Sequence, residues 1–388
     1  MPFLTATELQ DVLPNPKEIV TLLDRFIIGQ ESVKKALALM MLRRGLLRLQ
    51  SEGRIPTYPV FDKSNVMIIG ASGTGKTASV RALAKVMDTP IGIYDVTELT
   101  ASGYVGKDVA SLLERYVIQC EDWAEAHPQL FFAGVDEEEP EEYGMPPLDN
   151  RYAIIANKVR RTISEGVIYL DEIDKIRKKE TRGNDVGGDS VQSELLKILE
   201  GCDFELWQET NRKKPTTRAN IHTVNTTNIS FICGGAFEGL DEIIRHRMKK
   251  NTGIGFNNEI VVTNPNDLLK SVTTEDLINY GFRPELLGRV PLRACMQELS
   301  VEDLTRIITE PENNLYEQYK LVFKLFDVNF TIEKEAIQYL AEQAVKMKTG
   351  ARSLKQVFTS LLTDVLYDIY TYVGNDVNID LQYVKDRV

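Results

Sequence analysis

The stretch that decides the fold is NVMIIGASGTGKTASVRALAKVM, residues 65–87. It begins with a short apolar run that ends in glycine and finishes with apolar residues at helical spacing, so it predicts a strand, a loop and a helix. The loop, Gly70 to Thr77, satisfies the pattern G-x-x-x-x-G-K-[ST] in the strand-loop-helix context that this pattern requires. It therefore predicts a phosphate-binding loop (P-loop).

The residue types in this loop explain its chemistry. Glycines let successive backbone N–H groups curve around phosphate oxygens at a helix N-terminus, where the helix dipole favours anions. We expect Lys76 to reach the β and γ phosphates and Thr77 to ligate magnesium. ATP and Mg²⁺ are thus the expected cofactors, and the expected nucleotide-binding segment is Gly70, Ala71, Ser72, Gly73, Thr74, Gly75, Lys76 and Thr77.

A second apolar run, GVIYLDEID at residues 166–174, ends in acidic residues. In a nucleotide hydrolase, Asp171 would hold the magnesium ion and Glu172 would orient or activate the attacking water. Acids that merely mark the end of a strand are the alternative interpretation. The P-loop upstream favours the hydrolytic one and indicates an ATPase site.

Strands and helices alternate through most of the chain. IGIYDV, GVIYLDEID and ISFICGG have the composition of strands, and two helices around the loop IIGQ are expected before the P-loop. This alternation predicts an α/β fold, a three-layer αβα domain with a largely parallel sheet, which we place at residues 1–298.

Helices dominate after LLGRVPLRACMQEL, and we expect a small, mainly α-helical domain at residues 299–388. Ser300 and Asp303 resemble a capping box at the start of one helix. The last long helix carries its apolar residues on one face, at Leu354, Val357, Phe358, Leu361, Leu362, Val365 and Leu366.

Composition limits the function. The 388 residues are 43% hydrophobic and 27% charged, with a net charge of -11, which argues against a general affinity for nucleic acid. No apolar run is long enough to span a bilayer, and the N-terminus lacks the features of a signal peptide, so we expect a cytoplasmic protein that does not bind membranes. The four cysteines and three histidines show no metal-ligand spacing.

Two polar segments interrupt the pattern. An acidic insertion of about residues 124–150, with its proline- and glycine-rich part at 134–150, is expected to be a surface loop. Residues 208–223 are polar and basic and are also expected to form a loop.

With these residues placed, the chain resembles the AAA+ unfoldases of the ClpX/HslU family, and ClpX more than HslU. The resemblance runs from about residue 15 to the C-terminus and rests on FIIGQ, GYVGKDV, LDEIDKI, FICGGAFEGL, RPELLGRVP and KTGARSL in family order. It implies an adenine pocket at Ile27 and Ile28. It also implies a ring, a homohexamer, in which Arg289 is the arginine finger offered to a neighbouring subunit and Arg352 is the sensor arginine of the small domain. A buried structural arginine is the alternative interpretation of Arg289.

The resemblance further implies what the ring does. Tyr104 and Val105 would line a central pore and grip unfolded or tagged protein substrates. Ile254, Gly255 and Phe256 lie where ClpX proteins carry the loop that docks a ClpP-like peptidase. A stand-alone remodeller, including one that acts on nucleic acid, and an HslU-like partner of a different peptidase are the alternatives.

Some positions depart from the family pattern. ClpX proteins usually begin with a four-cysteine zinc domain, whereas this chain starts almost directly at the AAA+ module, so adaptor use is in doubt. RKK occupies residues 212–214, where the substrate-entry segment of ClpX proteins usually has histidine as its third residue. No role follows for the first sensor position, near Cys233 to Gly235.

Overall fold

The computed structural model describes residues 3–99, 109–132, 158–178, 188–205, 223–251 and 265–387. Its central element is a five-stranded sheet in the order β2-β3-β6-β1-β7, and all neighbouring strands are parallel. The strands are β1 (Val66–Ile69), β2 (Ile91–Asp95), β3 (Val167–Asp171), β6 (Ser230–Gly235) and β7 (Leu292–Cys295).

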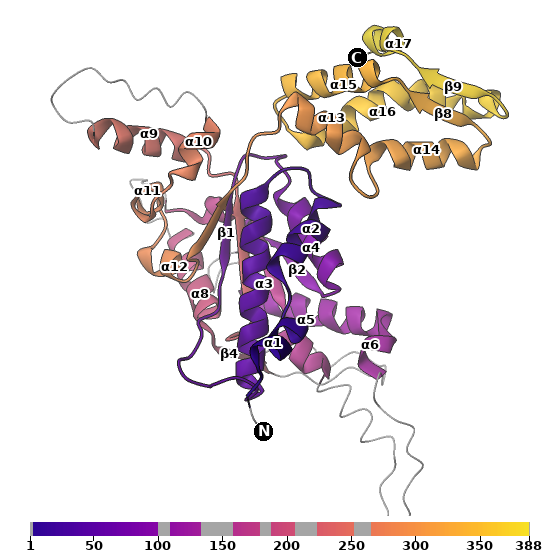
Figure 1. Ribbon diagram of the computed structural model, residues 1–388. Coiled ribbons are helices and arrows are strands. Elements are labelled where there is room, and N and C mark those ends of the chain that lie inside the picture. The colour runs from indigo at the N-terminus through magenta and orange to yellow at the C-terminus, as the bar shows by residue number, and fades with distance from the viewer. Residues whose placement is uncertain are drawn as a thin grey trace, which may run out of the picture.

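Both faces of the sheet are covered by helices, as a parallel sheet requires (Figure 1). Alternate residues of β1 point to opposite faces: Val66 and Ile68 join a core with α2 (Pro16–Asp24), α3 (Glu31–Ser51) and α4 (Lys76–Met87). Met67 and Ile69 join the core on the other face, which is built with α5 (Val109–Ala126), α8 (Gly188–Glu200), α9 (Leu240–Asn251), α11 (Thr274–Tyr280) and α12 (Pro284–Gly288). The predicted three-layer αβα architecture is confirmed.

The other elements of this unit are short. They are α1 (Ala6–Val12), the 3-10 helix η1 (Val96–Glu98), α6 (Pro128–Phe132), the 3-10 helix η2 (Ile173–Ile176), β4 (Asp203–Glu205), β5 (Thr223–Asn225) and α10 (Pro265–Lys270). The antiparallel pair β4-β5 brackets the polar segment expected at residues 208–223. The insertion expected at about residues 124–150 begins inside α5, and residues 133–157 lie outside the described part of the chain.

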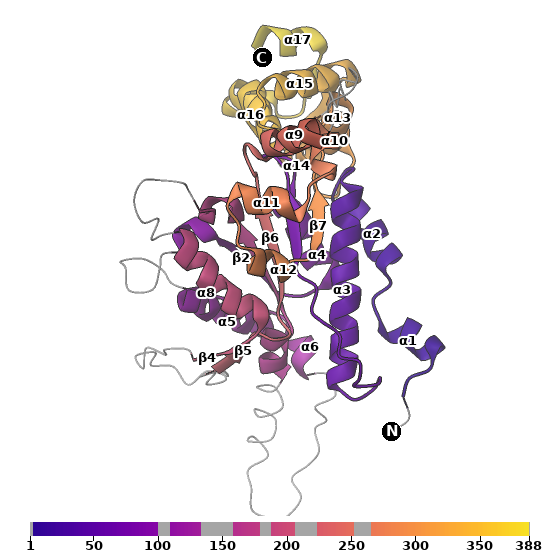
Figure 2. The same cartoon turned by 90° about the vertical axis from the view of Figure 1, so that its left-hand side faces the viewer.

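A second, smaller unit follows β7 and has its own hydrophobic core. It contains α13 (Val301–Thr309), α14 (Leu315–Leu325), α15 (Lys334–Lys346), α16 (Ala351–Tyr367), the 3-10 helix η3 (Ile369–Tyr372) and α17 (Leu381–Arg387), with a parallel pair formed by β8 (Asn329–Ile332) and β9 (Asp376–Ile379). The predicted capping box is present, with Ser300 accepting from the amide of Asp303. Figures 1 and 2 both show this unit at the end of the molecule away from the N-terminus.

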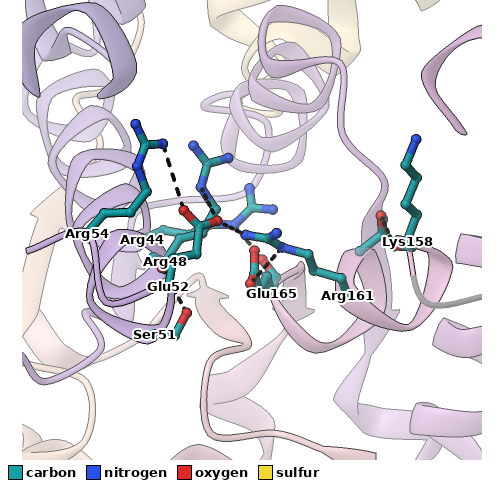
Figure 3. Close-up of polar contacts among 9 residues, drawn as sticks. Arg44, Arg48, Ser51, Glu52, Arg54, Lys158, Arg161 and Glu165 are labelled. Atoms are coloured by element: carbon teal, nitrogen blue, oxygen red, sulfur yellow. Dashed lines mark hydrogen bonds and ion pairs between the residues drawn. The ribbon is translucent and has the colours of Figure 1, made fainter. Parts of the chain in front are cut away.

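A network of arginines and glutamates ties α3 to the helical residues 158–164, which lead into β3 (Figure 3). Glu52 pairs with the guanidinium of Arg161 and lies 3.9 Å from the guanidinium nitrogens of Arg48 and Arg54. Arg161 also pairs with Glu165 at 3.1 Å, and Arg44 donates to the Glu165 carbonyl. The network fixes the start of β3, whose other end carries the candidate catalytic acids.

Candidate nucleotide site

The P-loop joins β1 to α4, and its glycines are required by its shape. Gly73 and Gly75 have φ values of 80° and 104°, in the left-handed region that glycine adopts without a steric penalty. A Cβ at Gly70 would lie 2.4 Å from the Cβ of Met296, which leaves no room for a side chain. The loop therefore closes tightly over the N-terminus of α4, where backbone N–H groups attract anions.

Lys76 lies across the P-loop. Its ammonium group donates to the carbonyl oxygens of Gly70 at 2.6 Å and Ala71 at 2.9 Å. Burial lowers the pKa of this ammonium, and the carboxylates of Asp171 and Asp174 act in the opposite direction. The loop thus carries a partly desolvated cation, which suits an interaction with phosphate oxygens.

Thr77 and Asp171 meet across two elements. The Thr77 hydroxyl donates to Oδ2 of Asp171 at 2.9 Å. Oδ1 of Asp171 accepts from the Tyr169 hydroxyl at 3.0 Å and from the Glu172 amide at 2.9 Å. Because burial raises the pKa of the Tyr169 phenol, this hydroxyl remains a donor. The adjacent Thr77 and Asp171 oxygens fit a magnesium ion that takes its remaining ligands from water and phosphates.

Glu172 follows Asp171 with an unusual backbone conformation. Its φ of 57° and ψ of 32° are left-handed, at the N-cap of η2, and its side chain is exposed. A non-glycine residue rarely adopts this conformation, and such strain is concentrated at functional sites. Glu172 thus directly follows Asp171 at the carboxyl end of β3, where Asp171 contacts Thr77 at the start of α4.

The small unit contacts the P-loop directly. Nη1 of Arg352 donates to the Ser72 hydroxyl at 2.9 Å, and the Ala351 amide donates to the Gly73 carbonyl at 2.9 Å. A Cβ at Gly350 would lie 2.6 Å from the Gly73 oxygen, so only glycine fits this approach. The structure thus brings Arg352, expected to act as a sensor of phosphate, onto the P-loop of its own chain.

Arg289 lies elsewhere. It follows α12, is 52% exposed, and pairs with Glu200 at the end of α8 at 3.0 Å. A buried structural arginine, the alternative considered for this position, does not agree with that exposure. Its described side-chain hydrogen bonds go to Glu200 and none go to the P-loop of the same chain.

The segment FIIGQ packs beside the P-loop. Ile27 and Ile28 are 9% and 6% exposed, and Ile27 belongs to the core under the sheet. Sequence reasoning used only these two residues and missed Gln30, which is 4% exposed and hydrogen-bonds to the Thr74 carbonyl at 3.4 Å. The burial of this glutamine is seen only in the folded chain, so the sequence offered no signal for it.

Asp174 was also missed. It is 2% exposed, and its Oδ1 accepts from the amide of Ala236 at 3.1 Å, so it joins the ends of β3 and β6. A Cβ at Gly235 would lie 2.5 Å from the same oxygen. The absence of a side chain at Gly235, within the first sensor position, therefore makes room for this carboxylate.

Several predicted residues lie outside the described part of the chain. These are Tyr104 and Val105 of the expected pore loop, residues 212–214, and Ile254, Gly255 and Phe256 of the expected docking loop. Among the described residues, no group of three or more His, Cys, Asp or Glu side chains could hold a metal ion. No helix in the described ranges is long and apolar enough to cross a membrane.

Two domain families match the chain. Residues 140–293 match the AAA domain (Cdc48 subfamily), and residues 299–372 match the C-terminal, D2-small domain of ClpB protein. The two matches follow the order of the large and small units seen in the structure.

Full-length comparisons are more specific. The chain is 35% identical over 370 residues to the ATP-dependent Clp protease ATP-binding subunit ClpX of Treponema denticola, covering 93% of this chain and 79% of that one. It is 36% identical over 361 residues to the protein of the same name from Borrelia duttonii, covering 92% and 75%. With that of Bacteroides fragilis it is 32% identical over 381 residues, covering 97% and 82%.

Proposed function

Because the chain belongs to the ClpX family of AAA+ ATPases, we propose that it is the ATP-driven unfoldase subunit of a cytoplasmic two-component protease. ATP binding and hydrolysis follow from the family. The observation that carries the proposal is the junction at the P-loop, where Thr77 contacts Asp171 and Arg352 contacts Ser72.

Each residue of the candidate site has a separate role in ATP binding or hydrolysis. Lys76 binds the β and γ phosphates, and Thr77 with Asp171 holds a magnesium ion, which neutralises phosphate charge when bound. Glu172 orients and activates the attacking water, while Ile27 and Ile28 hold the adenine. Arg352 joins the phosphates from the small unit, so nucleotide occupancy changes what the small unit contacts.

The active form in this proposal is a homohexamer. The pairing of Arg289 with a surface glutamate of its own chain, away from its own P-loop, agrees with an arginine that serves the site of a neighbour. Hydrolysis in each site then needs two subunits, which links turnover to ring assembly.

Substrate handling falls to two loops. Tyr104 and Val105 would contact unfolded or tagged polypeptide in the central pore, and Ile254, Gly255 and Phe256 would dock a ClpP-like peptidase. Apolar anchors on separate loops add their weak contacts through multivalency, which suits docking between two rings.

The test is degradation of a tagged, stably folded fluorescent protein with ATP, with and without a ClpP peptidase. We expect ATP-dependent loss of fluorescence both with and without the peptidase. Peptide products should form only when the peptidase is present. Tyr104→Ala should retain ATPase activity and lose unfolding. Phe256→Ala should retain both activities and lose peptide products.

Other results would contradict the proposal. Degradation only with the different peptidase that HslU proteins serve would favour the HslU-like alternative. ATPase stimulation by DNA without any unfolding would favour a remodeller of nucleic acid. Equal loss of ATPase and unfolding in Tyr104→Ala would make that residue structural.

A further inference from the structure

We propose that Gln30 is a positioning residue that couples the nucleotide site to the orientation of the small unit. The inference rests on the ATPase activity of the family and is independent of the proposed pore and peptidase.

Gln30 uses both ends of its amide. Nε2 donates to the carbonyl oxygen of Gln297 at 2.9 Å. It also donates to the carbonyl oxygen of Thr74 at 3.4 Å. Oε1 accepts from the backbone amide of Gln297 at 2.8 Å. One side chain therefore holds the P-loop and both polar groups of the backbone at residue 297.

The position of residue 297 gives these bonds their meaning. It lies between the end of β7 at Cys295 and Ser300, the N-cap of α13, on the segment that joins the two units. The Gln30 amide bonds to both the N–H and the C=O of residue 297, as a neighbouring strand would. It therefore fixes the start of the segment that leads from the sheet to the small unit. Arg352 is carried by the small unit, so its approach to Ser72 depends on the same segment.

The backbone of Gln30 is shaped for this task. It has a φ of 58° and a ψ of 36°, at the N-cap of α3, and its side chain makes no capping hydrogen bond to that helix. Glutamine is not a residue that favours left-handed backbone. Local helix capping would be served better by serine or aspartate, so the glutamine is explained by its long-range bonds.

Contacts between the units also occur on the other side of Gln30. Arg25 forms an ion pair with Glu312, and the Glu312 amide donates to the Arg25 carbonyl at 2.7 Å. The short segment from Arg25 to Gln30 is thus bound to the small unit at Arg25 and to the joining segment at Gln30. It also contains Ile27 and Ile28, so movement of this segment with nucleotide would be passed to the small unit.

Gln30 should therefore act on turnover more than on binding. It contacts the carbonyl of Thr74 and the joining segment, and its described bonds involve neither Lys76 nor Thr77. Losing one or two of its hydrogen bonds corresponds to about a tenfold effect on a rate.

The experiment compares two substitutions at Gln30 with the same substitutions at Gln50. Gln30→Asn keeps the amide and tolerates left-handed backbone but is too short, and Gln30→Met keeps the length without the polar groups. Gln50 is a matched control, because it is 8% exposed and makes three similar bonds to Pro56, Pro59 and Phe61, away from the nucleotide site.

Two readouts are taken on the full chain. The first is the kcat and KM of ATP hydrolysis. The second is energy transfer between probes at the exposed positions Lys35 on α3 and Lys355 on α16, introduced as unnatural amino acids, with and without ADP. Doubly labelled chains are diluted into excess unlabelled protein, so that transfer is measured within one chain.

We expect both Gln30 variants to lower kcat about tenfold, with KM changed less than about threefold, and to lose at least half of the ADP-dependent change in energy transfer. The Gln50 variants should retain wild-type values of both. An unchanged kcat, a rise in KM alone, or an equal effect of the Gln50 variants would overturn the inference. Because two variants are used, misfolding of one leaves the other as the test.

Discussion

The amide of Ala351 donates a 2.9 Å hydrogen bond to the carbonyl oxygen of Gly73, so the first turn of α16 lies directly on the P-loop. In the proposed site, nucleotide and the small unit would therefore share one short stretch of backbone. A change in the P-loop should therefore alter both nucleotide binding and the position of the small unit. The first prediction follows from this contact.

Gly73→Ala should lower the affinity for ADP at least about tenfold. Its new Cβ would lie 2.0 Å from the Thr349 carbonyl oxygen, at a φ of 80°, so the loop or the small unit must shift. Titration calorimetry with ADP measures the effect. Gly374→Ala is the matched control: at a φ of 77° its new Cβ would meet no atom within 4 Å, so it adds the backbone strain without a collision. Similar affinities for the two variants would show that the collision is relieved without moving the site.

Glu172→Gln should retain ATP binding and reduce turnover by a factor of about 100 or more, because the proposed general base is lost. The amide has the same shape as the carboxylate and leaves the Asp171 hydrogen bonds in place. Steady-state phosphate release and binding of a fluorescent ATP analogue check the two halves of the prediction. Exposed Glu335→Gln serves as a control. Turnover within a few fold of wild type would remove Glu172 from the proposed role.

Arg289→Ala should abolish most ATPase activity while hardly changing thermal stability. The Arg289–Glu200 pair is exposed, at 52% and 44%, and an exposed pair contributes about 0–1 kcal/mol. Arg306→Ala is the matched control, because Arg306 forms a comparably exposed pair with Glu310 at 2.9 Å. Only the first variant should lose activity.

A mixing experiment separates action within a chain from action across subunits. Combined Arg289→Ala and Glu172→Gln proteins contain some interfaces with both an intact acid and an intact arginine. ATPase activity should therefore reappear on mixing if Arg289 acts on a neighbour. Mixtures that stay as inactive as their components would place the arginine's effect within its own chain.

Glu52→Gln should lower the free energy of unfolding by about 1–2 kcal/mol. The variant leaves Arg44, Arg48, Arg54 and Arg161 (Figure 3) with Glu165 as the remaining carboxylate in the network. Urea denaturation at low and high salt measures it, and the loss should shrink with salt because screening weakens repulsion between the arginines. Glu317→Gln, which breaks an exposed pair with Lys320 at 3.6 Å, should change stability much less. A loss that is independent of salt would contradict the electrostatic explanation.

Short, almost fully apolar runs made much of the fold predictable. β1, β3 and β6 are buried throughout or almost throughout, and their sequences indicate strands without further information. β7 was missed because it is half-buried, spans four residues and pairs with β1 more than 200 positions earlier. The parallel pair β8-β9 was also missed, because four residues are too few for the alternation of buried and exposed positions to stand out in the sequence.

The candidate site divides in the same way. Gly70 to Thr77, Asp171 and Glu172 are continuous motifs, so their positions follow from the sequence. Gln30 contacts Gln297, and Asp174 contacts Ala236, in each case across a long stretch of sequence. No local pattern marks these contacts. Their roles depend on packing, which only the folded chain displays.

The sheet order has a consequence for synthesis on the ribosome. β1 lies between β6 and β7, so neither of its edges finds a partner until those later strands have been made. About 220 residues separate β1 from β7, which at ordinary elongation rates is roughly 10–45 s. During that interval the nascent chain presents an apolar strand with two open edges, which makes chaperone binding useful. The candidate nucleotide site is consequently among the last parts of the large unit to assemble, and ATP bound there could not stabilise the chain until nearly three hundred residues have been made.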